Sequence, residues 1–326
     1  MTIETVDPSS LKARDALRAA QLYYMQDLTM ETIARELHTS RSSVSRLLSF
    51  AREAGLVQIS IHSPLDLISR LQHELQDRFG VTAHVVPVPD RTSDVDRLER
   101  VALSAARILT TLVDSNMRIG LAWGSTVSAV ARHLPQKKTH NTHLVQLNGA
   151  ANERTSGIPY AGEILNRFAL AFGAEAHQFS VPALFDDPAT KEALWRERSI
   201  RRVLELQRRL DLAVFGLGSP VATVPSHVYA GDYFDARDRR ELAESGVVGD
   251  VATVFYRADG SDEGIGLNAR SSGPSLEVLR GIPRRFCIVS GVSKARSLGG
   301  ALAAGVITDL VVDEQTARHL VDTPSA

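Results

Sequence analysis

The sequence predicts an α/β protein, in which a small N-terminal winged helix-turn-helix domain precedes a larger Rossmann-like domain built on a parallel sheet. Residues 29–52 place apolar side chains at the spacing of two short crossing helices. From residue 81 onward, short apolar segments alternate with longer helical ones, the pattern of parallel strands joined by crossover helices. Because 326 residues exceed one average domain, we expect residues 1–62, a connecting helix over residues 63–80, and the sheet domain over residues 81–326.

The two helices within residues 29–52 carry the signals of a helix-turn-helix. Thr29 and Ser40 each precede a helix and can accept a hydrogen bond from its first turn. A larger side chain at Ala34, where the helices would cross, would push them apart. The inner faces are expected to consist of Ile33, Ala34 and Leu37 in the first helix and Val44, Leu47 and Leu48 in the second, with His38 and Thr39 as the turn.

The second of these helices has a basic outer surface with no acidic residue before Glu53. A helix that lies between the phosphates of a DNA groove requires such a surface. The residues expected to contact double-stranded DNA are Thr39, Ser40, Arg41, Ser42, Ser43, Ser45, Arg46 and Arg52. Two helices of an ordinary bundle are the alternative, but they would rarely combine two caps, a short turn and an acid-free basic helix. Residues 56–63 then alternate as a strand, which predicts the wing.

The connecting helix begins at Pro64 and carries Leu71, Leu75 and Phe79 at helical spacing, before Gly80 ends it. A helix between two domains has little of its own chain to pack on. We therefore expect this apolar stripe to be buried against a second copy of the chain, in a homodimer or homotetramer.

Composition restricts the partners and the location. The net charge of −1 provides no global attraction to nucleic acid, so contact with DNA must come from a local patch. The single cysteine, Cys287, lies in an apolar run and is expected to be a buried strand residue in a reducing compartment. No stretch is apolar enough to span a bilayer, so we expect no membrane partner and a cytoplasmic protein.

The pattern of the larger domain predicts seven strands, seven helices and one inserted hairpin. The strands are expected at residues 81–88, 117–123, 142–149, 174–181, 210–218, 286–291 and 307–313. The helices are expected near residues 94–114, 126–134, 160–172, 188–208, 236–244, 294–304 and 314–321. Residues 247–264 alternate around Asp259 and Gly260, which predicts a hairpin with its tip there.

Three loops that follow predicted strands share a small, donor-rich composition. They are Gly124-Ser125-Thr126, the segment from Gly216 through Gly218 and Ser219, and the segment from Gly291 to Lys294. Ligands of open parallel sheets bind beyond the carboxyl ends of the strands, where helix N-termini favour anions. Each loop alone could be a tight turn, but together they predict a sugar-phosphate site. Neither a dinucleotide fingerprint nor a nucleotide phosphate loop is present in the sequence.

Other clusters are interpreted as structural. His133, His140 and His143 fit no compact metal-binding turn and are expected to be solvated loop histidines, so we predict no metal site and no cofactor. The acidic residues between 258 and 264 are assigned to the hairpin tip, where Asp and Gly favour turn geometry.

The sequence resembles the SorC family of sugar-responsive transcriptional regulators, sometimes grouped under the DeoR name. The resemblance runs roughly from residue 12 to residue 321 and is strongest in residues 19–61, 120–131 and 291–320. It implies a winged DNA-binding domain and an effector domain similar to glucosamine-phosphate deaminases and ribose-phosphate isomerases. It also implies assembly as dimers or tetramers, with phosphorylated sugars or related metabolites as effectors.

The resemblance further implies roles for individual residues. Gly124, Ser125 and Thr126 would bind the phosphate beside Trp123, and Gln146 and Gly149 would line the pocket. Asp250 would bind sugar hydroxyls, and Lys294 would lie near the phosphate or hydroxyl end. We add Gly218, Ser219 and Asn148 to the expected lining. Some relatives use a lysine near the strand end that Asn148 occupies here, so no Schiff base is expected. Gly291-Val292 and Val312-Asp313-Glu314 depart from the usual motifs, which makes ligand identity less transferable than the fold.

We therefore expect a transcriptional regulator of carbohydrate metabolism whose operator affinity is controlled by a phosphorylated sugar or related metabolite. The alternative is a sugar-phosphate isomerase or deaminase with an accessory DNA-binding domain. Such an enzyme needs a base near the sugar C1 and C2 atoms, and only the hairpin tip or Asp313 and Glu314 could supply one. Because no second group falls beside Asp313, we expect no enzymatic activity.

Overall fold

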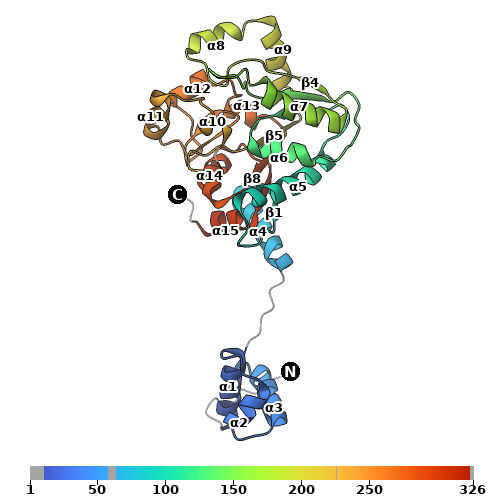
Figure 1. Cartoon of the computed structure of the whole chain (residues 1–326), viewed down its shortest axis with the longest axis vertical. Helices are drawn as coiled ribbons and strands as arrows, with labels where there is room; N and C mark the ends of the chain where they lie inside the picture. Colours follow the sequence, from blue (N-terminus) through green and yellow to red (C-terminus); the bar gives the residue numbers. More distant parts are fainter. Residues whose placement is uncertain (1–10, 58–63, 225, 324–326) are drawn as a thin grey trace. The chain divides into compact units, whose positions relative to one another are not determined.

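The computed structural model describes residues 11–57, 64–224 and 226–323. The chain forms two compact units, Met1–Pro64 and Leu65–Ala326 (Figure 1). In the part of the chain that the structure describes, no helix is both long and apolar enough to cross a membrane.

The N-terminal unit is a three-helix core that contains the predicted helix-turn-helix. Its helices are α1 (Leu11–Tyr24), α2 (Met30–Glu36) and α3 (Arg41–Glu53). Ile33, Ala34, Val44 and Leu48 are buried together, as their spacing predicted. The residues expected in the wing strand include 58–63, which lie outside the described residues.

Both predicted caps of this unit are confirmed. The Thr32 amide donates a hydrogen bond to Thr29 Oγ1 (3.3 Å) at the start of α2. The Ser43 amide donates to Ser40 Oγ (3.1 Å) at the start of α3. These bonds satisfy amides that have no partner within their own helix, so the caps fix where each helix begins.

The connecting helix α4 (Pro64–Phe79) packs on its own chain, which corrects the expectation of a dimer seam. Leu75 is fully buried and Leu71 nearly so, and both belong to the core that includes Ala83 of the sheet. Phe79 packs partly buried against the same core. At the end of the helix, the Arg78 guanidinium donates to the Thr323 carbonyl (2.7 Å). Leu71 and Leu75 are therefore unavailable to a second copy.

The larger unit is built on a seven-stranded parallel sheet with the strand order β1-β9-β8-β5-β2-β3-β4. The strands are β1 (Thr82–Val86), β2 (Arg118–Leu121), β3 (His143–Gln146), β4 (Glu175–His177), β5 (Leu212–Gly216), β8 (Arg284–Val289) and β9 (Asp309–Asp313). Each lies within a range that the apolar pattern predicted or overlaps it. Because every pair is parallel, all carboxyl ends lie at one edge of the sheet.

Helices cover both faces of this sheet, as the doubly wound pattern requires (Figure 1). The helices α5 (Asp94–Leu112), α6 (Ser125–His133) and α7 (Ile158–Phe172) bury apolar side chains in the core on one face. The helices α4, α9 (Arg198–Gln207), α14 (Ala295–Ala303) and α15 (Glu314–Asp322) contribute to the core on the other face. Shorter helices complete the unit, namely α8 (Pro188–Leu194), α10 (His227–Ala230), α11 (Ala236–Glu244), α12 (Gly266–Arg270), α13 (Leu276–Arg280) and the 3₁₀ turn η1 (Val292–Lys294).

Two predicted elements differ from the structure. The single helix expected over residues 188–208 is divided into α8 and α9. The inserted hairpin exists as β6 (Gly249–Val251) and β7 (Val254–Tyr256), but its turn is at Ala252 and Thr253, whose φ angles are 48° and 66°. Asp250 stabilises this turn, because its Oδ2 accepts a hydrogen bond from the Thr253 amide (3.1 Å). The prediction of a tip at Asp259 and Gly260 was wrong.

Replacing Leu75 by Ala should lower the free energy of unfolding by about 2 to 5 kcal/mol, because the substitution leaves a cavity in a filled core. The loss should be independent of protein concentration in urea denaturation. The control is Leu170→Ala on α7, where the side chain is 76% exposed and the change should be within about 0.5 kcal/mol. If Leu75→Ala unfolded like the wild-type protein but had a lower mass in sedimentation, Leu75 would instead contribute to a dimer interface.

Candidate functional site

A cavity opens at the carboxyl ends of β5, β2 and β3 and holds about 450 Å³, including its mouth. It brings together residues of all three predicted loops and of the hairpin. The predicted site residues that line it are Trp123, Gly124, Ser125, Thr126, Asn148, Gly218, Asp250 and Lys294. Its position beyond the carboxyl ends of parallel strands is that of a small-molecule site in a doubly wound protein.

The N-terminus of α6 faces this cavity. Gly124 is the N-cap and adopts a φ of 153°, which favours glycine, and it has no side chain that could cap the helix. Ser125 and Thr126 form the first turn and line the cavity. The first-turn amides and the helix dipole together favour an anion at this position.

Lys294 provides a buried ammonium group at the same cavity. Its side chain is 5% exposed, and Nζ donates a hydrogen bond to the Leu217 carbonyl (3.0 Å). Burial lowers the pKa of Lys294, while the nearby carboxylate of Asp250 opposes that shift. A bound anion would favour the charged ammonium form further.

Asp250 and Asn148 present buried oxygen atoms that accept hydrogen bonds. Asn148 Oδ1 has no hydrogen-bond partner among the described residues, and Asp250 Oδ1 has none of normal geometry, although both residues are at least 95% buried. The buried Tyr229 hydroxyl lies beside Asp250 and can donate to its carboxylate. Burial raises the pKa of Asp250 to about 6. Buried acceptors without partners are costly. The Tyr229 hydroxyl can serve Asp250, whereas Asn148 Oδ1 is left for a hydroxyl donor of a ligand.

Three predicted site residues support the cavity from behind and do not line it. Gln146 donates from Nε2 to the Asn148 carbonyl (2.7 Å) and accepts at Oε1 from the Phe179 amide (3.2 Å). Gly149 accepts from Trp123 Nε1 (2.8 Å), and a Cβ there would lie 2.2 Å from the Val181 carbonyl oxygen. Ser219 is buried, and its amide donates to Ser226 Oγ (3.3 Å).

One wall of the cavity is aromatic, and of its residues only Trp123 was predicted from the sequence. Trp123 stacks on Tyr233 with ring centroids 5.4 Å apart, and Tyr160 stacks on His227 at 4.4 Å. Burial lowers the pKa of His227, which favours the neutral imidazole. Ser226 and His227 line the cavity, as does Thr253 from the hairpin turn. Residues 226 and 227 follow no predicted strand, so no local signal marked them.

A second hollow of about 300 Å³ adjoins the cavity, and Ser125, Thr126 and Lys294 line both spaces. Ser290 also lines the second hollow, and its hydroxyl oxygen is buried without a hydrogen-bond partner in the described chain. The α6 N-terminus and the lysine therefore lie between two spaces that a ligand could fill.

Asp313, the residue considered as a catalytic base, has its carboxylate fully engaged. It accepts hydrogen bonds from the Gly291 amide (2.8 Å) and from the Thr316 amide and hydroxyl (3.0 and 2.6 Å), and it pairs with Arg97 (3.0 Å). Glu314 pairs with Arg318 on α15. Among the described residues that line the cavity, Asp250 is the one carboxylate. Neither Asp313 nor Glu314, which were considered as the base of an isomerase, lines the cavity.

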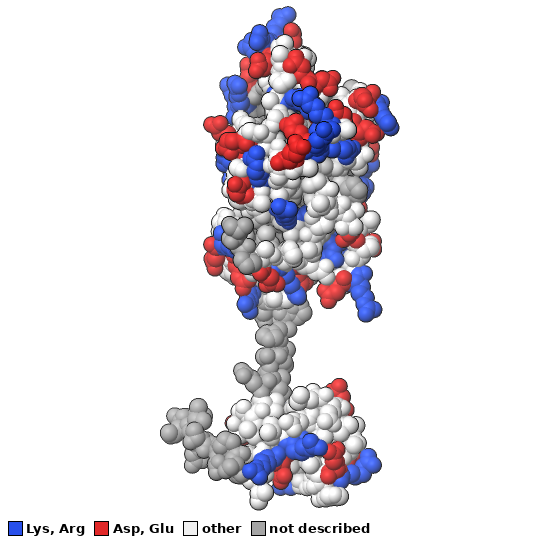
Figure 2. All heavy atoms as spheres, turned by 90° about the vertical axis from the view of Figure 1, so that its left-hand side faces the viewer, with Lys and Arg blue, Asp and Glu red and all other residues white. Residues whose placement is uncertain are grey.

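The outer face of α3 is exposed and mainly basic. Ser42, Ser45, Arg46 and Arg52 are exposed, whereas Ser43 is half-buried and joins Ser40 in the cap (2.9 Å between hydroxyls). On the face of the N-terminal unit that Figure 2 turns to the viewer, which is the side of α1 in Figure 1, Lys and Arg side chains form a band with Asp and Glu side chains beside it. The helix α3 has no acidic residue before Glu53, as expected, but Glu31 of the preceding helix α2 pairs with Arg41 (3.0 Å).

Comparison with known proteins gives consistent results. Residues 63–322 match the Sugar-bind family, a sugar-binding domain. The chain is 30% identical over 314 residues to the deoxyribonucleoside regulator of Bacillus subtilis, covering 95% of this chain and 98% of that protein. It is similar to the full-length sorbitol operon regulator SorC of Klebsiella pneumoniae, with 26% identity, a TM-score of 0.73, and coverage of 95% and 99%.

A structure from Arthrobacter aurescens TC1 has higher sequence identity. It is described as a domain of a possible sugar-binding transcriptional regulator, and it is 54% identical with a TM-score of 0.75. The match covers 80% of this chain and 100% of that domain.

The raised pKa of Asp250 should appear in the pH dependence of stability. The native state retains this proton up to about pH 6, whereas the unfolded chain releases it near the ordinary value of 3.8. The native state therefore binds more protons between these values, and the free energy of unfolding should fall as pH rises through that window. The contribution is of the order of 2 to 3 kcal/mol. Asp250→Asn should lose it in urea denaturation at several pH values, and an unchanged pH slope would contradict the assignment.

Proposed function

The chain belongs to the SorC family of sugar-binding transcriptional regulators, and on that premise we propose that a phosphorylated sugar or related metabolite controls its affinity for operator DNA. The observation that carries the proposal is the cavity, in which a helix N-terminus, a buried lysine and two buried side-chain acceptors converge. These groups match the two chemical ends of a sugar phosphate.

The phosphate end is proposed to lie at the start of α6. There the amides of Ser125 and Thr126, their hydroxyls and the Lys294 ammonium can all donate to phosphate oxygens. Because these three residues also line the adjoining hollow, the phosphate would lie between the two spaces. The Ser290 hydroxyl, buried without a described partner, would be a further donor.

The sugar end is proposed to lie against Asp250 and Asn148. Both residues offer an oxygen that accepts hydrogen bonds, and sugar hydroxyls can donate to Asn148 Oδ1 and to the carboxylate of Asp250, which can accept more bonds than the Tyr229 hydroxyl provides. Trp123 and His227 would cover the apolar side of the sugar. Such an arrangement, with few polar groups that fix orientation and aromatic walls, is common in small-molecule sites.

The DNA end is proposed to be the outer face of α3. In a helix-turn-helix, the second helix enters the major groove and its N-terminal residues contact base edges. We propose Arg46, Ser42 and Ser45 as the central contacts, flanked by Thr39, Ser40, Arg41, Ser43 and Arg52. Helix-turn-helix proteins bind two half-sites as dimers, so we retain a homodimer or homotetramer as a proposal, with an interface other than Leu71 and Leu75.

Regulation, and not catalysis, is the function that the comparisons support. The relatives are named as regulators of operons or of transcription. A ligand changes DNA affinity only by as much as it prefers one arrangement of the protein over another, typically about 1 to 3 kcal/mol, or about 5- to 150-fold. The same factor must apply to the effect of DNA on effector affinity.

Arg46→Ala should weaken binding to DNA selected from a random library by the wild-type protein. A lost base contact would cost about 1 to 3 kcal/mol, and a lost phosphate contact would reduce the salt slope by about 1. The matched control is Arg14→Ala, which removes an exposed arginine from α1 of the same unit. If fluorescence anisotropy gave equal affinities for folded Arg46→Ala and wild-type protein, α3 would not be the reading helix.

Lys294→Met should raise the effector concentration that is needed for the DNA response at least about tenfold, because a charged hydrogen bond is worth about 1.5 to 3 kcal/mol. The effector-free DNA affinity should stay unchanged, since Lys294 belongs to the other compact unit. The probe is whichever phosphorylated sugar of a thermal-shift panel stabilises the wild-type protein. Lys138→Met, at an exposed lysine, is the control. An unaltered response in Lys294→Met would place the effector elsewhere.

A further inference from the structure

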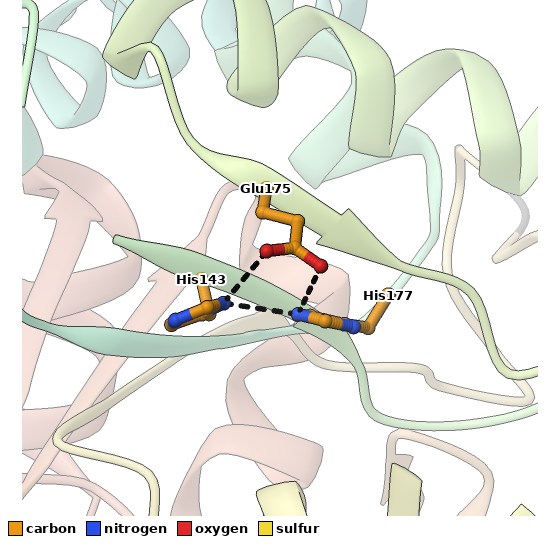
Figure 3. A group of neighbouring side chains, drawn as sticks. All are labelled: His143, Glu175 and His177. Atoms are coloured by element: carbon orange, nitrogen blue, oxygen red, sulfur yellow. Dashed lines mark hydrogen bonds and ion pairs between the residues drawn. The ribbon is translucent and has the colours of Figure 1, made fainter. Parts of the chain in front are cut away.

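Three side chains of the larger unit converge at the edge of the sheet that is formed by β4. They are His143 of β3 and Glu175 and His177 of β4 (Figure 3). His143 Nδ1 lies 3.0 Å from His177 Nε2. The two carboxylate oxygens of Glu175 each lie 3.6 Å from one of these nitrogens. In Figure 3 all three groups point toward one shared point.

Strand register brings these residues together. His143 is opposite Glu175 in the parallel ladder, and His177 follows two positions later on the same face. His143 and Glu175 begin their strands and His177 ends the three-residue β4, but none of the three lines the cavity. The cluster is therefore separate from the effector site. The expectation that His143 is a solvated loop histidine was wrong, because it is a strand residue.

We propose that His143, Glu175 and His177 bind one divalent zinc ion. Zinc takes imidazole and carboxylate ligands with bonds of about 2.0 to 2.2 Å in a tetrahedral arrangement. Ligand atoms at that distance and angle lie about 3.3 Å apart. The separations of 3.0 and 3.6 Å in this cluster are close to that value, so an ion fits with small side-chain adjustments. Two imidazoles and one carboxylate leave the fourth position for water or another ligand.

The two histidines would bind the metal as neutral imidazoles. The neutral form is the one that coordinates metals. The His177 side chain is 11% exposed and that of Glu175 is 62% exposed, so the open position faces solvent. A hydrogen bond between two neutral imidazoles is the competing account of the 3.0 Å distance.

A bound ion would join the edge strand to its neighbour. The strand β4 has three residues and pairs only with β3. It is the edge strand on that side of the sheet, because no further described strand pairs with it. An ion would link three side chains across this short pairing and so resist its opening. An ion that binds the native state but not the unfolded chain raises the free energy of unfolding by mass action. The proposed ion would therefore stabilise this edge of the sheet.

The test is zinc binding by untagged full-length protein after chelator treatment. Calorimetric titration with zinc chloride should give a stoichiometry near one, and the metal should raise the melting temperature. Magnesium, which prefers oxygen ligands, should cause no shift. Cobalt(II) should give the visible absorption bands of a tetrahedral site. The variants His177→Gln and His143→Gln should each weaken zinc binding at least about tenfold.

The matched controls change other histidines in the same unit. His140→Gln removes an exposed imidazole, and His133→Gln removes one that pairs with Glu99 on α5. Both control proteins should bind zinc like wild type. Equal zinc affinity in His177→Gln, or loss of binding in a control, would assign the metal to another site. Wild-type protein that binds no zinc would leave the hydrogen-bonded imidazole pair as the explanation and overturn the proposal. None of these outcomes depends on DNA or effector binding.

Discussion

The carboxylate of Asp313, fully buried at the end of β9, holds together the elements around the cavity. It caps α15 through Thr316, fixes the Gly291 loop through a backbone amide, and pairs with Arg97 of α5. Arg97 is itself 5% exposed, so the buried guanidinium and the buried carboxylate of Asp313 each stabilise the other's charge. Removing one partner of such a pair typically costs about 3 to 5 kcal/mol, because it leaves the other charge buried and alone.

This network determines where Lys294 lies. The Gly291 loop leads directly into η1, which ends at Lys294. Because the Gly291 amide donates a hydrogen bond to Asp313 at the start of this loop, the position of the lysine is restricted. A Leu217 carbonyl from the loop after β5 completes that placement. The cavity therefore depends on contacts between segments that are far apart in the chain. Asp313, which a sequence motif could suggest as a base, has a positioning role here.

The cavity differs from an ordinary core in its unsatisfied polar groups. Burial favours the protonated form of Asp250 and the neutral form of Lys294, although each charge favours the other's ionised state. Asn148 Oδ1 there has no hydrogen-bond partner among the described residues. A folded protein retains such unfavourable groups most readily where a ligand can satisfy them.

Periodicity in the sequence determined the element types. The spacing of Val44 and Leu48 predicted a helix that packs on Ala34, and apolar runs predicted seven strands, because regular burial imposes regular apolar positions. The caps at Thr29 and Ser40 and the loop at Gly124 were also predicted, since their chemistry is local. Periodicity shows that Leu75 is buried but not which surface buries it, and only the tertiary structure placed it in its own core. The tertiary structure also placed the aromatic wall of the cavity, the hairpin turn beside Asp250, and His143 next to His177. No spacing in the sequence relates the residues that form these contacts, so strand order and register were needed to bring them together.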